Sequence, residues 1–131
     1  MNTETTVRQA IEAYDRQDLD QVAAMLAEDL CYTINARAET GPYIADCHSK
    51  SEFFDAVGKI LDDWEIGSYK IADLVVSGDR AAAQINILMI SRHTGKSIES
   101  RLALFMQTRD GKLTRIDEYH DTIAAGSSRA A

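Results

Sequence analysis

The sequence predicts a single α+β domain in which a curved antiparallel sheet carries its helices on one face. Two observations predict this class. The first half of the chain holds stretches with apolar residues at helical spacing, interrupted by one stretch of period-two alternation. The second half holds four long strand-like runs divided by glycine turns. With 131 residues the chain has the size of one domain, so we expect residues 1–131 to fold as one unit.

Two helices are expected first. Thr6 and Gln9 have the spacing of a capping box, and apolar residues at helical spacing follow them to about Gln17. Asp18 and Gln21 repeat the capping pattern before a second, shorter apolar stripe. The two helices should therefore form a hairpin.

One strand and a third helix come next. Apolar or aromatic residues alternate with more polar ones at Leu30, Tyr32, Ile34 and Ala36. A loop with Gly41 and Pro42 should follow this strand. Ser49 and Glu52 are then spaced to cap a third helix with a broad apolar face.

Four strands complete the predicted sheet. The strand-like runs are "WEIGSYKIADLVV", "RAAAQINILMISR", "SIESRLALFMQT" and "KLTRIDEYHD". The turns between them are "SGD", "HTGK" and "DG", which are short enough to make neighbouring strands antiparallel. The last residues, "GSSRAA", have the composition of a frayed tail.

Composition excludes several classes of function. The formal net charge is −7 without a cluster of Lys and Arg, which disfavours a nucleic-acid surface and an anionic membrane. No apolar run approaches the roughly 18 residues of a membrane helix, and the polar N-terminus lacks a secretory signal, so we expect a cytoplasmic protein. Cys31 and Cys47 are too far apart for a metal or redox motif. We expect two free thiols, no metal and no cofactor.

Ionisable side chains are concentrated in "RIDEYHD", Arg115 to Asp121. If the turns are two-residue hairpins, Arg101 lies opposite His120 and Ala103 opposite Glu118. A mixed face then holds Gln84, Asn86, Leu88, Glu99, Arg101, Ala103, Phe105, Ile116, Glu118 and His120. An apolar face holds Ile85, Ile87, Met89, Ser100, Leu102, Leu104, Met106, Asp117, Tyr119 and Asp121. A bulge at either turn would slip this register.

The pattern leaves two interpretations open. In the first, the apolar face is the core, and the charges of the mixed face form a solvated ladder of ion pairs with little energetic value. In the second, the mixed face lines a cleft beneath the helices while the apolar face packs against a second subunit.

The order of elements, the segment "DLDQVAAMLAEDLCYTI" and the last hairpin "RDGKLTRIDEYHD" resemble the nuclear transport factor 2-like superfamily, which includes the SnoaL-like polyketide cyclases and the ketosteroid isomerases. The resemblance covers Thr6 to Ile123. It implies a cone-shaped fold with an apolar pocket between the concave sheet and the helices, and a homodimer formed through the sheet. It also implies that the mixed face is the inner one.

The chemistry of the ketosteroid isomerases does not carry over. Their oxyanion-hole tyrosine, base and protonated aspartic acid correspond here to Ala10, Ile34 and Ala103. Limonene-epoxide hydrolases use two aspartates beside an arginine, and only this charge pattern is similar around Arg101. Glu118 of "DEY" resembles the acid/base glutamate of the phenazine-biosynthesis relatives.

These residues suggest a SnoaL-like enzyme that performs cofactor-free acid/base chemistry on a modest apolar or aromatic substrate. His120 would be the general acid or base, Glu118 its partner, and Arg101 the group that holds an enolate, carboxylate or oxyanion. The expected pocket residues are Tyr14, Tyr32, Ile34, Trp64, Asn86, Glu99, Ala103 and Phe105. Cyclisation, isomerisation, dehydration and epoxide opening all fit. The alternative is a ligand-binding or dimerisation module without chemistry.

Overall fold

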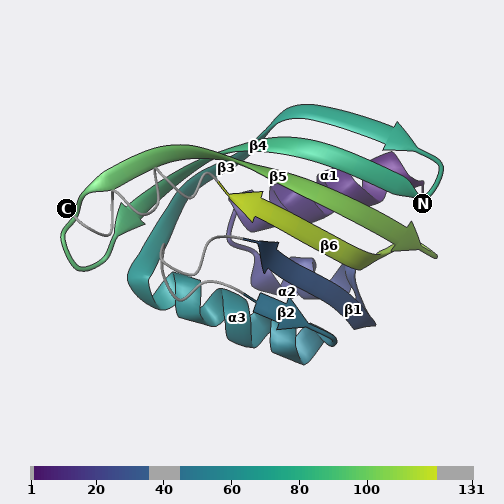
Figure 1. Cartoon of the computed structure of the whole chain (residues 1–131), viewed down its shortest axis with the longest axis horizontal. Coiled ribbons are helices and arrows are strands. Elements are labelled where there is room, and N and C mark those ends of the chain that lie inside the picture. The colour runs from purple at the N-terminus through teal and green to yellow at the C-terminus, as the bar shows by residue number, and fades with distance from the viewer. Residues whose placement is uncertain (1, 36–44, 121–131) are drawn as a thin grey trace.

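A computed structural model describes residues 2–35 and 45–120, which form three helices and one six-stranded sheet (Figure 1). The helices are α1 (Thr3–Asp15), α2 (Leu19–Ala24) and α3 (Lys50–Asp63). The strands are β1 (Leu26–Asn35), β2 (Ala45–Cys47), β3 (Trp64–Ser77), β4 (Arg80–Ser91), β5 (Ser97–Arg109) and β6 (Lys112–His120). The predicted α+β class is confirmed. The predictions for Ala36, for the loop with Gly41 and Pro42, and for Asp121 and the tail lie outside the described residues.

The strand order is β2-β1-β6-β5-β4-β3. Strands β3 to β6 form the predicted antiparallel meander, but β1 runs parallel to β6, so the sheet is mixed rather than wholly antiparallel. No short turn joins β1 to β6, and therefore no local signal in the sequence fixes their relative direction. Strand β2 was not predicted because its three residues are too few to show a period.

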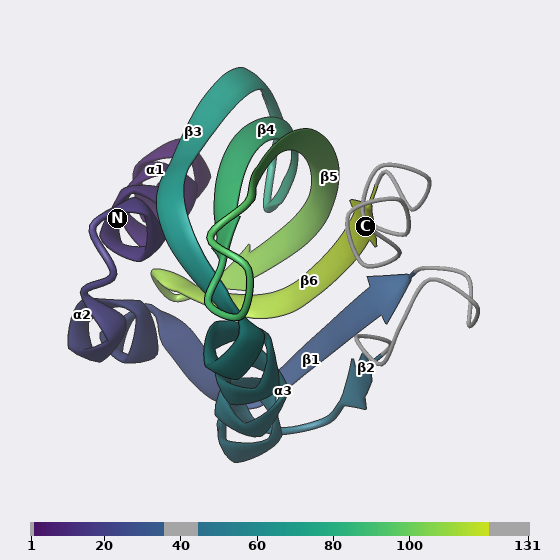
Figure 2. The same cartoon turned by 90° about the vertical axis from the view of Figure 1, so that its left-hand side faces the viewer.

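The sheet is strongly curved, and the helices lie on one of its faces (Figures 1 and 2). Helix α1 contacts β3, β4, β5 and β6, while α3 contacts β1, β2 and β3. We call the face toward the helices the inner face and the opposite one the outer face. The core between the inner face and the helices includes the fully buried side chains of Val7, Leu26, Leu30, Ile85 and Leu113.

The N-terminal helix begins earlier than predicted. The side chain of Asn2 accepts a hydrogen bond from the Thr5 backbone N–H at 2.8 Å and caps α1. Thr6 instead lies buried within the helix, where its hydroxyl donates to the Asn2 carbonyl. The predicted caps Asp18 and Ser49 are confirmed at the starts of α2 and α3.

A bulge in β6 changes which side chains share a face. The last hairpin begins as predicted, with Arg109 opposite Lys112 across a turn whose two residues both have positive φ. The pairs Thr108–Leu113 and Gln107–Arg115 then leave Thr114 as an extra residue on β6. Beyond it, Glu118 lies opposite Leu104, and His120 lies opposite Leu102. The predicted opposition of His120 to Arg101 and of Glu118 to Ala103 is therefore wrong.

Because of the bulge, each face of the sheet contains residues from both of the faces that the sequence predicted. The inner face takes the apolar side chains of β4 and β5, namely Ile85, Ile87, Leu102, Leu104 and Met106, together with Ile116 and Glu118 of β6. The outer face takes Asn86, Glu99, Arg101, Ala103 and Phe105 together with Asp117 and Tyr119. The expectation that the mixed face is the inner one is thus right for β6 and wrong for β4 and β5. Hydrophobic alternation alone had indicated the correct faces for those two strands.

Candidate functional site

A cavity of about 70 Å³ lies between the inner face and the helices. Its wall is mainly apolar and includes Ala10 and Ile11 of α1, Phe53, Val57 and Ile60 of α3, and Leu102, Leu104 and Met106 of β5. Among the described residues that line it, Glu118 is the one with a carboxyl group, and Tyr14, Tyr32 and Tyr69 add three phenol hydroxyls. An apolar cavity with a few convergent polar groups is the usual form of a small-molecule site.

Glu118 is 7% exposed, yet both of its carboxylate oxygens have partners. The hydroxyl of Tyr32 donates to Oε1 at 3.1 Å, and Nε2 of His120 contacts Oε2. Glu118 and His120 are two residues apart in β6, so the strand places both side chains on the same face. A buried carboxylate is costly unless it is paired, and here both an imidazole and a phenol pair with it.

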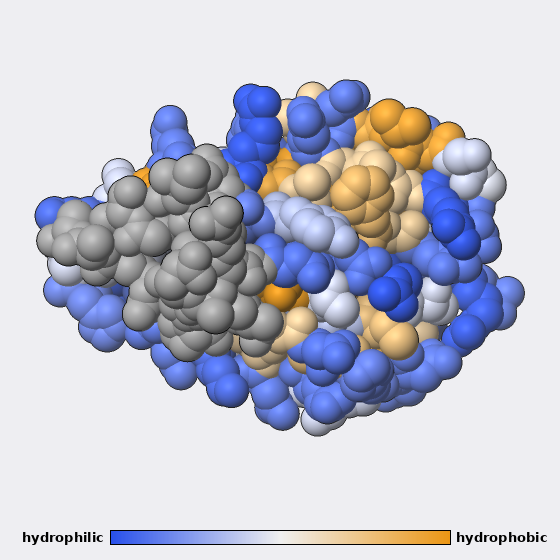
Figure 3. All heavy atoms as spheres, viewed as in Figure 1, coloured by the Kyte–Doolittle hydropathy of each residue, from blue (hydrophilic) through white to orange (hydrophobic). Residues whose placement is uncertain are grey.

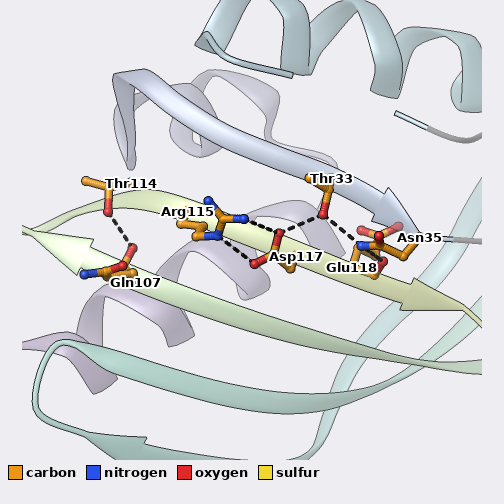
Figure 4. Close-up of polar contacts among 7 residues, drawn as sticks. All are labelled: Thr33, Asn35, Gln107, Thr114, Arg115, Asp117 and Glu118. Atoms are coloured by element: carbon orange, nitrogen blue, oxygen red, sulfur yellow. Dashed lines mark hydrogen bonds and ion pairs between the residues drawn. The ribbon is translucent and has the colours of Figure 1, made fainter. Parts of the chain in front are cut away.

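Hydrogen bonds on the outer face fix β6 to β1 where Glu118 lies (Figure 4). Arg115 pairs with Asp117 at 2.8 Å, and Asp117 accepts a hydrogen bond from the Thr33 hydroxyl at 2.7 Å. The Asn35 amide donates to the Thr33 hydroxyl and, at 3.2 Å, to the backbone carbonyl of Glu118. This network holds the backbone of Glu118 beside β1 while its side chain points to the cavity.

The electrostatics of the cavity keep its three tyrosines protonated. Burial raises the pKa of Tyr32 and Tyr69 well above the ordinary value, and the negative charge of Glu118 raises both further. The same two causes raise the pKa of Tyr14, opposed by a weaker effect of the Gln17 side chain. All three hydroxyls can therefore act as hydrogen-bond donors at any physiological pH.

His120 has a raised pKa for a different reason. Burial alone would lower the pKa, but the negative charge of Glu118 and its hydrogen bond outweigh burial and favour the imidazolium form. The side chain of His120 is 22% exposed, so it lies between Glu118 and solvent. Such a pair can pass a proton between a buried carboxylate and the exterior.

The structure brings together four of the residues that the sequence suggested. Glu118, Tyr14 and Tyr32 line the cavity, and His120 contacts Glu118. Ile34 is buried and is paired with Glu118 across the parallel strands β1 and β6. Trp64 is buried at the start of β3. Neither Ile34 nor Trp64 lines the cavity.

The remaining predicted site residues lie on the outer face. Arg101 is exposed, and its Nε donates to the Asn86 side chain at 3.1 Å rather than facing Glu118. Glu99, Ala103 and Phe105 lie on the same face. The expected cluster of Arg101, Glu118 and His120 is therefore wrong, because the bulge at Thr114 puts Arg101 on the other side of the sheet.

Tyr69 was not among the predicted site residues, and a second bulge brings it into the cavity. Trp64 and Ile66 are buried at even positions of β3, but the pairing with β4 shifts between Ile66 and Ser68. After the shift, the odd-numbered Tyr69 is on the inner face. The available signal was Gly67, since a glycine inside a strand pattern often marks a bulge. A Cβ at this position would lie 2.9 Å from Cδ2 of Leu88.

Within residues 2–35 and 45–120, no group of three His, Cys, Asp or Glu side chains could hold a metal ion. Cys31 and Cys47 are free thiols. No helix in the same part of the chain is long and apolar enough to cross a membrane.

The model of the SnoaL-like domain family matches residues 7–116 of the chain. No curated protein matches it. Among solved structures, a nuclear transport factor 2-like protein of Burkholderia thailandensis E264 superposes with a TM-score of 0.85 at 24% identity, covering 98% of each chain. A proposed polyketide cyclase of Pseudomonas putida KT2440 gives a TM-score of 0.79 at 21% identity, covering 97% of each chain.

A third structure, a proposed isomerase of Bacillus subtilis, gives a TM-score of 0.82 at 15% identity and covers 98% of this chain and 92% of its own. At these identities the three structures establish the fold, and the match of the family model extends over most of the sequence. The chain therefore belongs to the SnoaL-like domain family.

Proposed function

We propose that this SnoaL-like protein performs acid/base chemistry, without a cofactor, on a small apolar molecule held in the cavity. The observation that carries the proposal is the environment of Glu118, whose two oxygens are held by Tyr32 and His120 at the wall of an apolar cavity. A carboxylate and an imidazole in such contact are a workable proton-transfer pair. The names of the structural neighbours, a cyclase and an isomerase, agree with this class of chemistry.

Glu118 and His120 would have different roles in proton transfer, because they occupy different positions relative to the cavity. Glu118 faces the cavity and accepts a proton from an acidic C–H or O–H of the bound molecule. His120 contacts the other carboxylate oxygen, stabilises the negative charge of Glu118, and can return a proton or exchange it with solvent. Tyr32 fixes the orientation of the carboxylate. Isomerisation, dehydration, cyclisation and epoxide opening all require such a step.

The size of the cavity limits the substrate. Typical small-molecule pockets measure about 300–1,000 Å³. A volume of about 70 Å³ instead favours a compact molecule of few ring atoms. The apolar wall favours a hydrocarbon or aromatic body with a single polar group.

The test is turnover of a panel of small β,γ-unsaturated ketones, β-hydroxy ketones and epoxides by the wild type and by the H120Q variant. We expect H120Q to lose about 10²- to 10⁴-fold in kcat/KM for any substrate that is converted. The matched control is H93Q, because His93 also pairs with a carboxylate, Asp63, but lies in an exposed turn. Activity of H120Q within twofold of the wild type would refute the assignment.

The alternative is a ligand-binding or dimerisation module without chemistry, and the outer face supports the dimerisation part of it. Phe105 is 53% exposed and Tyr119 is 48% exposed, and their rings pack edge to face with 5.8 Å between the ring centroids. Figure 3 shows apolar side chains gathered over the strands of this face with hydrophilic ones around them. We propose that a second copy of the chain covers this face, and this arrangement is compatible with either function.

A further inference from the structure

The position of Arg101 on the outer face raises the question of which group holds the polar end of a bound molecule. None of the described residues that line the cavity is a lysine or an arginine. The polar groups that do line it are the Glu118 carboxylate and the hydroxyls of Tyr14, Tyr32 and Tyr69. Among the described residues, a group that recognises the polar end of a bound molecule must be one of these four.

The hydroxyls differ in how they are already used. That of Tyr32 donates to Glu118, whereas no described residue accepts a hydrogen bond from that of Tyr14. The Gln17 amide donates to the Tyr14 backbone carbonyl at 2.6 Å and lowers the pKa of the phenol. Residues 2–35 and 45–120 provide no hydrogen-bond partner for the Tyr69 hydroxyl, although Tyr69 is only 7% exposed. No side-chain polar atom in this part of the chain is both fully enclosed and unpaired, so this hydroxyl is not fully enclosed, and Tyr69 is one of the residues that line the cavity.

Tyr69 is also held firmly in place. Its backbone N–H donates to the Asp15 carboxylate at 2.8 Å, and Lys70 binds the other oxygen of Asp15 at 2.6 Å. Its ring packs edge to face against the ring of Tyr14, with 4.7 Å between the ring centroids. Tyr69, one of the two cavity tyrosines with an unpaired hydroxyl, is thus fixed by a connection between β3 and the end of α1, as a recognition group must be.

We propose that the Tyr69 hydroxyl is the specificity-determining donor of the cavity, and that the cavity binds neutral molecules with one hydrogen-bond-accepting oxygen, such as a ketone, ether or epoxide, and rejects carboxylates. This inference rests on the proposed ligand site but not on catalysis. In the chemistry proposed above, the same hydroxyl would bind the oxygen on which negative charge develops.

Electrostatics gives the reason for rejecting anions. A bound carboxylate would lie in an apolar cavity beside the negative charge of Glu118, with no cation among the described lining residues. The positive charge of His120 is already engaged by Glu118. A neutral oxygen does not meet this repulsion, and it satisfies a donor that would otherwise stay unpaired.

Three ring-matched probes test the proposal. Cyclopentanone carries the acceptor oxygen, methylenecyclopentane replaces it by an isosteric CH₂ group, and cyclopentanecarboxylate carries a negative charge. Their dissociation constants for the wild type and for Y69F would be measured by ¹⁵N chemical-shift titration at millimolar concentrations. The control is Y119F, which removes an exposed hydroxyl from the outer face.

We expect the wild type and Y119F to bind cyclopentanone about three- to tenfold more tightly than methylenecyclopentane, as one hydrogen bond provides. Y69F should bind the two probes equally, and none of the three proteins should bind the carboxylate. The proposal is overturned if Y69F keeps the preference, if it loses affinity for both probes equally, if the carboxylate binds best, or if the wild type binds no cyclopentanone. Loss of turnover in H120Q together with an unchanged preference in Y69F would retain the proposed function and reject only this inference.

Discussion

The imidazole of His120 binds a proton more readily in the folded chain than in the unfolded one, because Glu118 raises its pKa. A raised folded-state pKa means that protonated His120 stabilises the fold. This contribution is fully present below the unfolded value of about 6.5 and is lost as the pH rises through the folded pKa. The three cavity tyrosines have raised pKa values and stay neutral over this range.

We therefore predict that the difference in free energy of unfolding between the wild type and H120Q decreases as the pH rises from about 6 to 9. Urea unfolding at several pH values measures this difference. H93Q serves as the control, since its histidine lies in an exposed turn. A difference that stays constant or increases with pH would contradict the pairing of His120 with Glu118.

For single residues, the sequence could predict the sheet face correctly where only the alternation of side chains within one strand decides it. Glu118 and His120 are two apart in one strand, so their common face did not depend on the register with β5. The roles predicted for Arg101, Asn86 and Ala103 did depend on that register, and the structure places all three residues on the outer face. Tyr69 was missed because its face depends on the bulge at Gly67.

At the level of elements, the bulge at Thr114 decides what the last hairpin presents to the cavity. The Thr114 hydroxyl donates to the Gln107 carbonyl at 3.2 Å (Figure 4). This extra residue turns Ile116 and Glu118 inward. Without the bulge, the strand would turn Arg115, Asp117 and Tyr119 toward the core instead.

We predict that deletion of Thr114 lowers the midpoint of thermal unfolding by roughly 10 °C or more, or prevents folding, because a regular hairpin would bury charged side chains in place of Ile116. Differential scanning calorimetry measures the midpoint. The T114S variant, which keeps both the residue count and the hydroxyl, should stay close to the wild type. A deletion variant as stable as T114S would show that the bulge does not set the inner face.

The sequence predicted the elements better than their pairing. The caps at Asp18 and Ser49, the positions of the glycine turns and the alternation in β4 and β5 are local signals, and each was confirmed. The turn between β4 and β5 is longer than the two-residue hairpin that was predicted, because Ile90 lies opposite Ser97. The parallel pairing of β1 with β6 and the two bulges depend on contacts between distant segments. Hydrophobic patterning does not encode such contacts in a single sequence.

For the whole molecule, one row of paired residues across the outer face of the curved sheet includes two exposed apolar side chains. Val75, Ala82, Phe105 and Asp117 are successive partners in the register of four neighbouring strands. Val75 is 63% exposed and Phe105 53% exposed. Exposed aromatic and aliphatic side chains in such an array are typical of an interface.

We predict that the wild type sediments as a dimer and that F105E sediments as a monomer, because a second copy on this face would remove the hydration of a glutamate at position 105. Analytical ultracentrifugation measures the mass. T94E, with the same new charge in the exposed turn after β4, should remain dimeric. A monomeric wild type, or a dimeric F105E, would contradict this use of the outer face.

The central claim is that Glu118 and His120 form a paired proton-transfer site at the cavity, and an NMR titration of His120 in the wild type and in E118Q tests it most directly. The chain has three histidines, so His48 and His93 provide internal references in the same spectra. The account predicts a pKa of His120 above about 6.5 in the wild type and below it in E118Q, where only the effect of burial remains. Equal pKa values in the two proteins, or a wild-type value below about 6.5, would contradict it.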